Sequence, residues 1–446
     1  MTSRVRRAGG FALVGTLALA APALGAAAAA PFAAVALLAA FVVTEGRLFE
    51  LFARPGDHED GQLNGLAGFA LAATGLALLT TVPQAGLRMP ATVFATTVLV
   101  LSYGNLAEQA VRTQSGDPFP RVAGFAGGGF LAGTLGGVAV QTVQGTPLTA
   151  LDAPTSAFLA ATGVLVAALL RTMLFQRDDP LVMLTVGLLL WGLSALGLGV
   201  TFPEIAFALG VMFFLGYASY AIGTASVPGM LTGVLLGMLT IVLGGIGWFA
   251  PLIAFFGIGA LSTKFRYEAK QERGVAEDND GARGTGNVLG NAAVALVAVI
   301  GYAASPQLPV PALADLFLFA FAGSLATAMS DTLSSEIGGL YDEPRLITTF
   351  ERVPPGTDGG VTWQGEVAGV AGAGLIALIA VGLLAVSPLG ALVVVTGGVG
   401  GMTVDSVLGA TLEGDRVGNE AVNFLATLSG ALVSVLLALF LLPAGP

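Results

Sequence analysis

The feature that most constrains this chain is a series of long apolar runs with almost no charged residues. Each run is close to the length of about 20 residues that a helix needs to cross a hydrocarbon layer about 30 Å thick. We therefore predict an all-α, polytopic integral membrane helical bundle with about 15 transmembrane helices and a range of 13 to 17. The predicted spans are residues 9–28, 31–46, 64–84, 89–106, 122–144, 154–173, 180–199, 203–222, 228–246, 248–263, 287–304, 313–330, 366–386, 389–408 and 421–442.

Composition supports a membrane location and excludes several kinds of chemistry. The chain is 55% hydrophobic and 10% charged, which leaves too little polar surface to coat a soluble globule. It contains no cysteine, so disulfides, iron–sulfur clusters and thiol nucleophiles are excluded. Its single histidine, His58, lies in an acidic loop and is predicted to be solvated. With a net charge of −10, no nucleic-acid partner is expected.

The positive-inside rule gives the predicted orientation. With the N-terminus in the cytoplasm, 17 of the 18 Lys and Arg residues fall on the cytoplasmic side, and only Arg88 falls outside. We therefore predict a multi-pass protein of the cell membrane whose N-terminus and charged loops are cytoplasmic. Its polar residues concentrate in three inner loops of the C-terminal half, at 264–286, 331–365 and 411–423.

The same map predicts two membrane domains. Residues 1–180 form an N-terminal domain without a clustered motif, and residues 181–446 form a C-terminal domain that carries the three polar loops. Arg4 to Arg7, followed by an apolar run, could be read as a cleaved secretory signal. We expect a retained first span instead.

The second inner loop begins with a carboxylate beside several hydroxyl groups. On a helix, Asp331 shares a face with Ser334 and Ser335, and Glu336 lies one turn beyond Thr332. Carboxylates beside hydroxyls at a membrane edge commonly hold a hard cation and its bound phosphates. The alternative interpretation is a helix end capped by polar residues, and the sequence leaves both open.

A glycine- and threonine-rich segment follows in the same loop. Its glycines allow backbone N–H groups to converge on an anion, while the threonines add hydroxyls and an arginine adds charge. The segment lacks the Gly-Lys-Ser/Thr ending of a Walker loop, so no P-loop activity follows. A Pro-Gly turn between two helices is the simpler alternative. The residues concerned are Arg345, Gly356, Thr357, Gly359, Gly360 and Thr362.

Lysines and asparagines mark the first loop. Lys264 and Lys270 could reach phosphates as flexible point charges, although cytoplasmic lysines often do no more than anchor spans. Asn287 and Asn291 lie one turn apart as the next span begins, and buried amides require hydrogen-bond partners.

The last polar region repeats this pattern. Asp405 lies inside or at the end of a predicted span, where a carboxylate is costly and indicates function. With Asp331 it could form a two-carboxylate cation site. Asn419 and Asn423 lead into the final span.

Residues 205–442 resemble the family known as domain of unknown function 92, or the transmembrane protein 19 family. Gly284-Thr285-Gly286 and Asp358 are mild departures from its pattern. The resemblance rests on six segments in chain order: Ser262-Thr263-Lys264 with Lys270; Gly281-Ala282-Arg283 with Asn287 to Asn291; Asp331-Thr332 with Ser335 to Gly338; Pro355-Gly356-Thr357 with Gly359 to Thr362; Asp405-Ser406; and Asn419 with Val422-Asn423.

Plant members of that family include the phytyl-phosphate kinase of tocopherol synthesis. The resemblance therefore implies phosphorylation of a phytyl- or geranylgeranyl-type prenyl monophosphate, dissolved among membrane lipids, to the diphosphate. A weaker likeness to CTP-using dolichol and phytol kinases favours CTP over another nucleoside triphosphate, with Mg²⁺. Such a transfer needs a metal, cationic clamps and backbone donors, and neither His nor Cys.

The resemblance also implies roles for individual residues. Asp331, Ser335 and Glu336 are the candidate catalytic residues, and Asp331 and Asp405 are the candidate Mg²⁺ ligands. The candidate nucleotide- or phosphate-binding residues are Lys264, Lys270, Arg283, Asn287, Asn291, Arg345, Gly356, Thr357, Gly359, Gly360, Thr362, Asn419 and Asn423.

The main alternative is a transporter or channel for a small solute or ion, in which Asp331, Asp405 and the asparagine pairs line a path. The number of predicted spans favours that alternative. Against it, the polar groups cluster in loops on one face, and the chain has no clear internal repeat.

Overall fold

The computed structural model describes residues 3–82, 88–174, 179–276, 284–310, 313–413 and 417–442. Most of them are helical, and the described residues contain one two-stranded sheet. The helix contacts divide the chain into two compact units, residues 1–206 and 207–446. The boundary predicted near residue 180 stays a prediction. Each unit is described by itself below.

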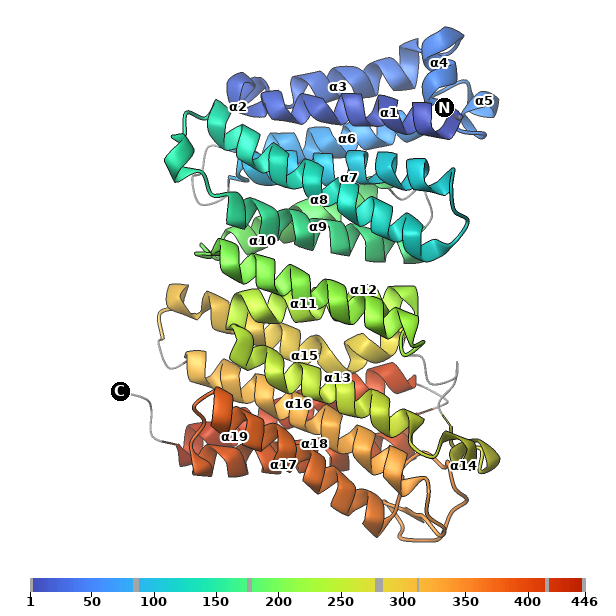
Figure 1. Cartoon of the computed structure of the whole chain (residues 1–446), viewed down its shortest axis with the longest axis vertical. Helices are drawn as coiled ribbons and strands as arrows, with labels where there is room; N and C mark the ends of the chain where they lie inside the picture. The colour runs from blue at the N-terminus through green and yellow to red at the C-terminus, as the bar shows by residue number, and fades with distance from the viewer. Residues whose placement is uncertain are drawn as a thin grey trace. The chain divides into compact units, whose positions relative to one another are not determined.

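Unit 1 consists of helices that run back and forth along nearly the same direction (Figure 1). Its elements are α1 (Ser3–Thr16), η1 (Leu17–Ala20), α2 (Ala21–Leu24), η2 (Gly25–Ala27), α3 (Ala30–Leu37), η3 (Leu38–Val42), α4 (Gly46–Phe52), α5 (Asp57–Asp60), α6 (Asn64–Leu79), α7 (Ala91–Arg112), α8 (Pro118–Val143), η5 (Leu148–Ala150), α9 (Ala153–Met173) and α10 (Asp179–Ser194).

Helix α7 is the centre of unit 1, where it packs against α1, α8, α9 and α10. The closest approach is made by α8, whose glycines face α7. A Cβ atom at Gly129 would lie 2.8 Å from the carbonyl oxygen of Val100, and one at Gly133 would lie 2.7 Å from the Val100 side chain. Small residues therefore permit the close helix contact that packing in a membrane requires.

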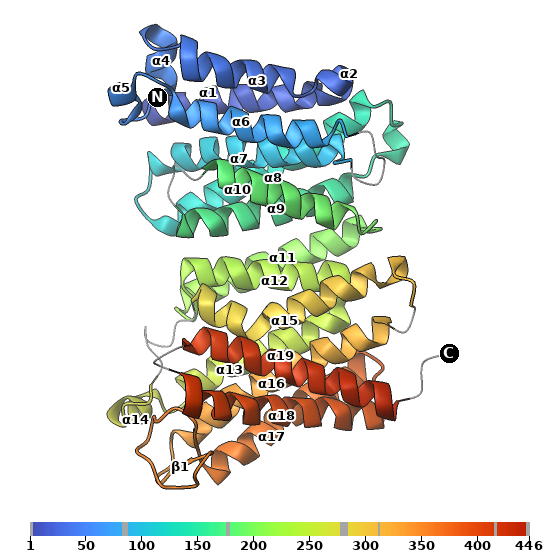
Figure 2. The same ribbon diagram turned by 180° about the vertical axis from the view of Figure 1, so that it is seen from behind.

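Unit 2 contains the second helical group and the small sheet (Figures 1 and 2). Its elements are α11 (Phe202–Ala221), which crosses the division, α12 (Val227–Gly244), α13 (Ile246–Lys264), α14 (Tyr267–Glu272), α15 (Thr285–Ala304), η8 (Ser305–Gln307), α16 (Leu313–Gly338), β1 (Arg345–Leu346), β2 (Gly360–Val361), α17 (Trp363–Leu383), α18 (Pro388–Leu412) and α19 (Asn419–Leu441).

Helix α16 is the core of unit 2. It packs against α13, α15, α17, α18 and α19, and its middle third is almost completely buried. Glycines again bring the helices together: a Cβ atom at Gly398 of α18 would lie 2.8 Å from the Cβ atom of Ala326. The polar residues Ser324, Thr327 and Ser330 of α16 are buried in this packing.

The starts of several helices follow directly from local sequence. Asp117 and Asp152 accept hydrogen bonds from backbone N–H groups in the first turns of α8 and α9, and Ser226 and Ser387 do the same for α12 and α18. Each of these caps is followed within two residues by proline. A capping oxygen followed by proline is a strong helix-start signal, because proline needs no N–H partner there.

The all-α polytopic architecture is confirmed. Within the described residues, 11 helices are long and apolar enough to cross a membrane, or 12 if Ala30–Val42 and Gly46–Phe52, bent by 109°, form one span. All fifteen predicted runs overlap a described helix, but α6 and α10 have only 16 residues each. The total of fifteen spans stays a prediction.

Candidate functional site

Three polar segments of unit 2 meet at one end of the helices, where Figure 2 shows α14 beside the loop that carries β1. Strands β1 and β2 pair antiparallel, with Arg345 opposite Val361. The segment after α14 reaches this loop, because a Cβ atom at Gly356 would lie 3.3 Å from the Val275 side chain. The loop in turn rests on α18. Parts of the chain that are far apart in sequence therefore form one polar end of the unit.

The structure brings the two candidate metal ligands together. Asp331 lies on α16 and Asp405 on the adjacent α18, and their carboxyl groups are within hydrogen-bonding distance. Asp405 Oδ1 is buried and has no hydrogen-bond partner among the described residues. Two carboxyl groups at this separation repel when both are ionised, so they favour a shared proton or a cation between them.

The pair of Asp331 and Asp405 suits a magnesium ion better than it suits a metal ion whose ligands all come from the protein. The described residues contain no cluster of three or more His, Cys, Asp or Glu side chains. Mg²⁺ is commonly held by one or two carboxylates, with water and substrate phosphates completing its six oxygen ligands. The unpartnered oxygen of Asp405 beside Asp331 supplies that kind of incomplete, all-oxygen set.

Further negative charge surrounds the end of α18. Glu413 follows the last residue of the helix, and its pKa is raised by burial and then by the nearby carboxylates of Asp358 and Asp405. From the sequence, Asp358 is only a departure from the family pattern, and Glu413 belongs to none of the predicted motifs. A charged residue directly after an apolar span was the available signal for Glu413. This end of unit 2 thus carries several carboxylates that a cation would stabilise.

The glycine-rich loop has a conformation that only glycine accommodates easily. Gly359 has φ +74°, and a Cβ atom there would lie 2.5 Å from both the Ser406 carbonyl oxygen and the Ala410 Cβ atom. Gly356 also has positive φ, at +81°. The missing side chain at Gly359 lets the loop backbone rest on α18, one turn beyond Asp405.

Three polar groups of this loop have partners within the chain. Thr357 Oγ1 donates to the Pro354 carbonyl oxygen at 2.8 Å, and Thr362 Oγ1 accepts from Gly365 N at 3.2 Å as the cap of α17. Arg345 is exposed and donates to the Phe350 carbonyl oxygen at 2.7 Å. The turn and cap interpretation is therefore sufficient for both hydroxyls, and phosphate binding by this loop stays a prediction.

Lys270 and Glu336 form a buried ion pair at 2.5 Å, with side chains only 1% and 7% exposed. The Lys270 ammonium also donates to the carbonyl oxygens of Ser262 and Thr263, each at 2.8 Å. These three acceptors equal its three N–H bonds. Thr263 Oγ1 donates to the other Glu336 oxygen at 2.6 Å. The geometry thus gives both residues a structural role, joining α13 and α14 to α16, and does not support phosphate binding by Lys270 or catalysis by Glu336.

Other candidate residues lie around this end of the unit. Lys264 is exposed, with its ammonium 5.7 Å from the centre of the Tyr267 ring. Ser335 is exposed and donates to the Thr332 carbonyl oxygen at 3.1 Å. Arg283 lies outside the described residues.

The four candidate asparagines lie on α15 and α19, which pack against each other and against α16. Asn291 is buried and donates to the Asn287 carbonyl oxygen at 2.9 Å, while Asn287 Oδ1 is buried without a hydrogen-bond partner among the described residues. Asn423 is buried and Asn419, the first residue of α19, is exposed. Asn287 therefore has an acceptor to offer a ligand, whereas Asn291 already has a partner.

Comparisons with known proteins match the part of the chain that forms unit 2. The family model described as integral membrane protein DUF92 matches residues 210–431. Protein VTE6, chloroplastic, of Arabidopsis thaliana is 33% identical over 52% of this chain and 70% of its own length. An uncharacterized membrane protein of Methanocaldococcus jannaschii is 35% identical over 47% and 84%, and Protein PGR of Arabidopsis thaliana is 30% identical over 47% and 79%. No solved structure matches the chain.

Proposed function

Because this chain belongs to the DUF92 family of integral membrane proteins, we propose that it is a membrane phosphotransferase for prenyl phosphates. The reaction transfers a phosphoryl group from a nucleoside triphosphate, with CTP as the first choice, to a phytyl- or geranylgeranyl-type monophosphate. The products are the prenyl diphosphate and a nucleoside diphosphate.

The observation that supports this proposal most strongly is the facing pair of Asp331 and Asp405 at the polar end of unit 2. Phosphoryl transfer is achieved chiefly by positioning and by neutralising charge, and it requires no nucleophilic side chain. When bound, Mg²⁺ would neutralise charge on the phosphate oxygens. Asp331 and Asp405 would hold the ion, and the unpartnered Asp405 oxygen is available for it.

The neighbouring groups have complementary roles in the proposal. Lys264, Arg283 and Arg345 attract the phosphates, and the backbone from Gly356 to Gly360 lies beside the nucleotide. The prenyl tail lies between the helices, in contact with lipid. The phosphate to which it is attached then reaches the polar end of unit 2, which we infer from the positive-inside rule to face the cytoplasm.

The direct test is product formation by detergent-purified protein supplied with Mg²⁺, labelled CTP or ATP, and phytyl or geranylgeranyl monophosphate. Labelled prenyl diphosphate is the expected product. Asp331→Asn should abolish its formation, whereas Asp315→Asn, at the opposite end of the same helix, should not. The absence of product with either nucleotide and either lipid would overturn the proposal, and solute flux into vesicles would then test the transporter alternative.

A further inference from the structure

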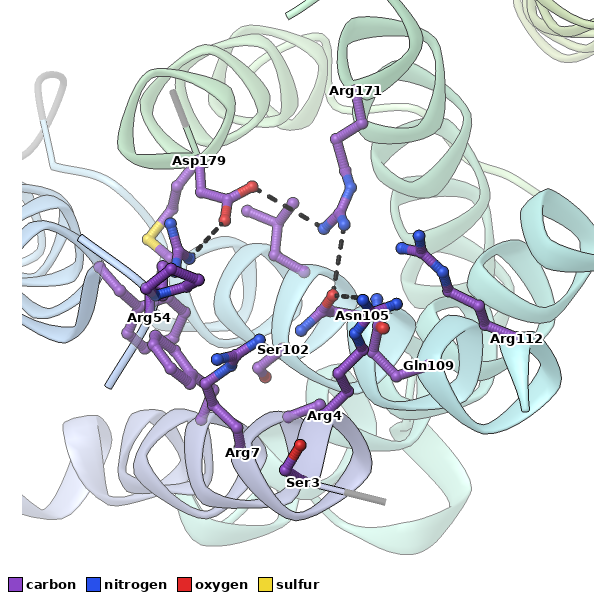
Figure 3. Close-up of a pocket in the computed structure, with 16 residues that line it drawn as sticks. Ser3, Arg4, Arg7, Arg54, Ser102, Asn105, Gln109, Arg112, Arg171 and Asp179 are labelled. Atoms are coloured by element: carbon purple, nitrogen blue, oxygen red, sulfur yellow. Dashed lines mark hydrogen bonds and ion pairs between the residues drawn. The ribbon is translucent and has the colours of Figure 1, made fainter. Parts of the chain in front are cut away.

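Unit 1 contains a cavity of about 420 Å³ where α1 and α10 begin and α7 and α9 end (Figure 3). This volume falls within the range of about 300–1,000 Å³ that is typical of small-molecule sites. Of its sixteen lining residues, five are arginines and one is a carboxylate, Asp179. The arginines are Arg4, Arg7, Arg54, Arg112 and Arg171.

Two of the five arginines have carboxylate partners. Arg54 pairs with Asp179 at 3.0 Å, and Arg171 pairs with Glu108 at 3.0 Å. Within the described part of the chain, the other three have no carboxylate within 4.0 Å: these are Arg4, Arg7 and Arg112. Positive charge therefore exceeds negative charge around this cavity, although the whole chain has a net charge of −10.

Anchoring at the membrane surface does not account for this arrangement. Arginines at the ends of spans commonly extend towards water, and that explains Arg6 and Arg47, which are exposed and do not line the cavity. Arg4 is exposed as well, but it lines the cavity. In contrast, Figure 3 shows arginines from α1, α7 and α9 approaching one space. Their mutual repulsion is costly near a membrane unless an anion offsets it.

Part of the cavity lining is apolar. Phe11, Phe69, Leu101 and Met183 line it, and the Arg54 guanidinium lies 5.9 Å from the centre of the Phe11 ring. Neutral polar groups complete the lining, including the buried side chains of Ser102 and Gln109. A ligand with a strongly anionic end and an apolar remainder would match both the arginines and the apolar part of the lining.

We propose that this cavity is a binding site for a multiply charged phosphate group, carried either by a soluble phosphate compound or by a lipid head group. Guanidinium groups bind phosphate oxygens through paired N–H donors, and a dianion matches several uncompensated arginines better than a carboxylate does. All lining residues belong to unit 1 and precede the family match at residues 210–431, so this site does not depend on the proposed transferase activity.

The test measures binding by the full-length protein in phosphatidylcholine nanodiscs, with EDTA present so that metal-dependent binding in unit 2 is suppressed. One arm titrates pyrophosphate by calorimetry. The other compares thermal midpoints in nanodiscs with and without phosphatidic acid, because a ligand of the folded state raises the midpoint. The variant is the double substitution Arg4→Gln and Arg112→Gln, and the matched control is Arg6→Gln on the same turn of α1.

We expect the double variant to bind pyrophosphate at least about tenfold more weakly, or to lose the phosphatidic acid shift, while Arg6→Gln changes neither. Pyrophosphate binding identifies a soluble source, and a shift with phosphatidic acid alone identifies a lipid source. Failure of the unaltered protein to respond in both arms overturns the proposal, as does an equal response in the double variant. If the double variant cannot be purified, Arg112→Gln alone makes the same comparison.

Discussion

The two units arrange their charges in opposite ways. In unit 2, two carboxyl groups from neighbouring helices face each other, and the buried lysine is fully paired. In unit 1, arginines surround a cavity, and three of them have no carboxylate partner in the described structure. Unit 2 therefore favours a cation, whereas unit 1 favours an anion.

Under these two proposals, helical bundles of one fold class provide a cation site in unit 2 and an anion site in unit 1. In unit 2, Asp331 is brought to Asp405 by helices that glycines allow to pack closely. In unit 1, the start of α1 and the ends of α7 and α9 bring Arg4, Arg112 and Arg171 to one cavity. The charge of each site is set by a few residues at helix ends, where polar groups cost least.

Removing a carboxylate from unit 2 should give the largest effect. Asp405→Asn is expected to reduce phosphoryl transfer on the order of a thousandfold, the scale for loss of a major charge-stabilising group. Without Mg²⁺ its thermal midpoint should match or exceed that of the unaltered protein, because repulsion with Asp331 is relieved. The increase in midpoint on adding Mg²⁺ should disappear. Asp315→Asn is the control. If Asp405→Asn transfers phosphoryl groups as fast as the unaltered protein, Asp405 is not a ligand of the proposed Mg²⁺ site.

The buried ion pair in unit 2 is the next test. Lys270→Met leaves Glu336 charged and buried, so we expect a loss of about 3–5 kcal/mol in the free energy of unfolding, measured by denaturation in detergent. Arg352→Gln, which breaks the exposed pair with Glu343, should cost no more than about 1 kcal/mol.

The double variant Lys270→Met with Glu336→Leu separates structure from catalysis. An apolar pair removes the unpaired charge, so much of the lost stability should return. If the pair is structural, the folded double variant should keep most of its transferase activity. A stable double variant without activity would instead restore the sequence-based catalytic role of Glu336.

The sequence was sufficient to predict a helical membrane protein, and it singled out Asp331 and Asp405 without placing them together. Apolar runs of about 20 residues predict spans directly, Asp331 directly follows such a run, and Asp405 lies inside or at the end of another. Their approach could not be predicted, because it depends on the packing of α16 against α18. The burial of Lys270 could not be predicted for a related reason, because a lysine in a loop has the same sequence signature whether it is solvated or buried.

The cavity of unit 1 left no local pattern in the sequence. Arg4, Arg54, Arg112 and Arg171 are spread over more than 160 residues, and each taken alone is an ordinary residue at a span end. Only tertiary packing brings them together. The polar loops of unit 2 can therefore be recognised from their clustered motifs, whereas the cavity of unit 1 cannot be predicted from arginines that are scattered in the sequence.

A substitution at Gly359 tests whether the loop of unit 2 must rest on α18. The proposed site of unit 1 is a cavity and requires no such loop contact. Gly359→Ala combines a positive φ with a clash against Ser406 and Ala410, so a loss of about 1–3 kcal/mol is expected. Transfer should fall as the loop moves away from α18. Gly374→Ala is the control, because it lies within α17 with open space around it and should be neutral or slightly stabilising. Equal stability and activity in both variants would show that the loop contact is dispensable.

Breaking the partly exposed ion pair between Arg171 and Glu108 in unit 1 should have the smallest effect on stability. The result can be compared directly with that for the buried pair of Lys270 and Glu336. Glu108→Gln removes the carboxylate that Arg171 contacts at 3.0 Å, but both side chains are about 15% exposed and Arg171 still contacts Asn105 at 3.2 Å. We expect a loss of about 1 kcal/mol in unfolding free energy, because water can replace part of the lost interaction. Pyrophosphate should also bind more tightly, since a negative charge beside the cavity is gone. A loss as large as that of Lys270→Met, or weaker binding of pyrophosphate, would mean that the arginines of unit 1 are already neutralised within the protein.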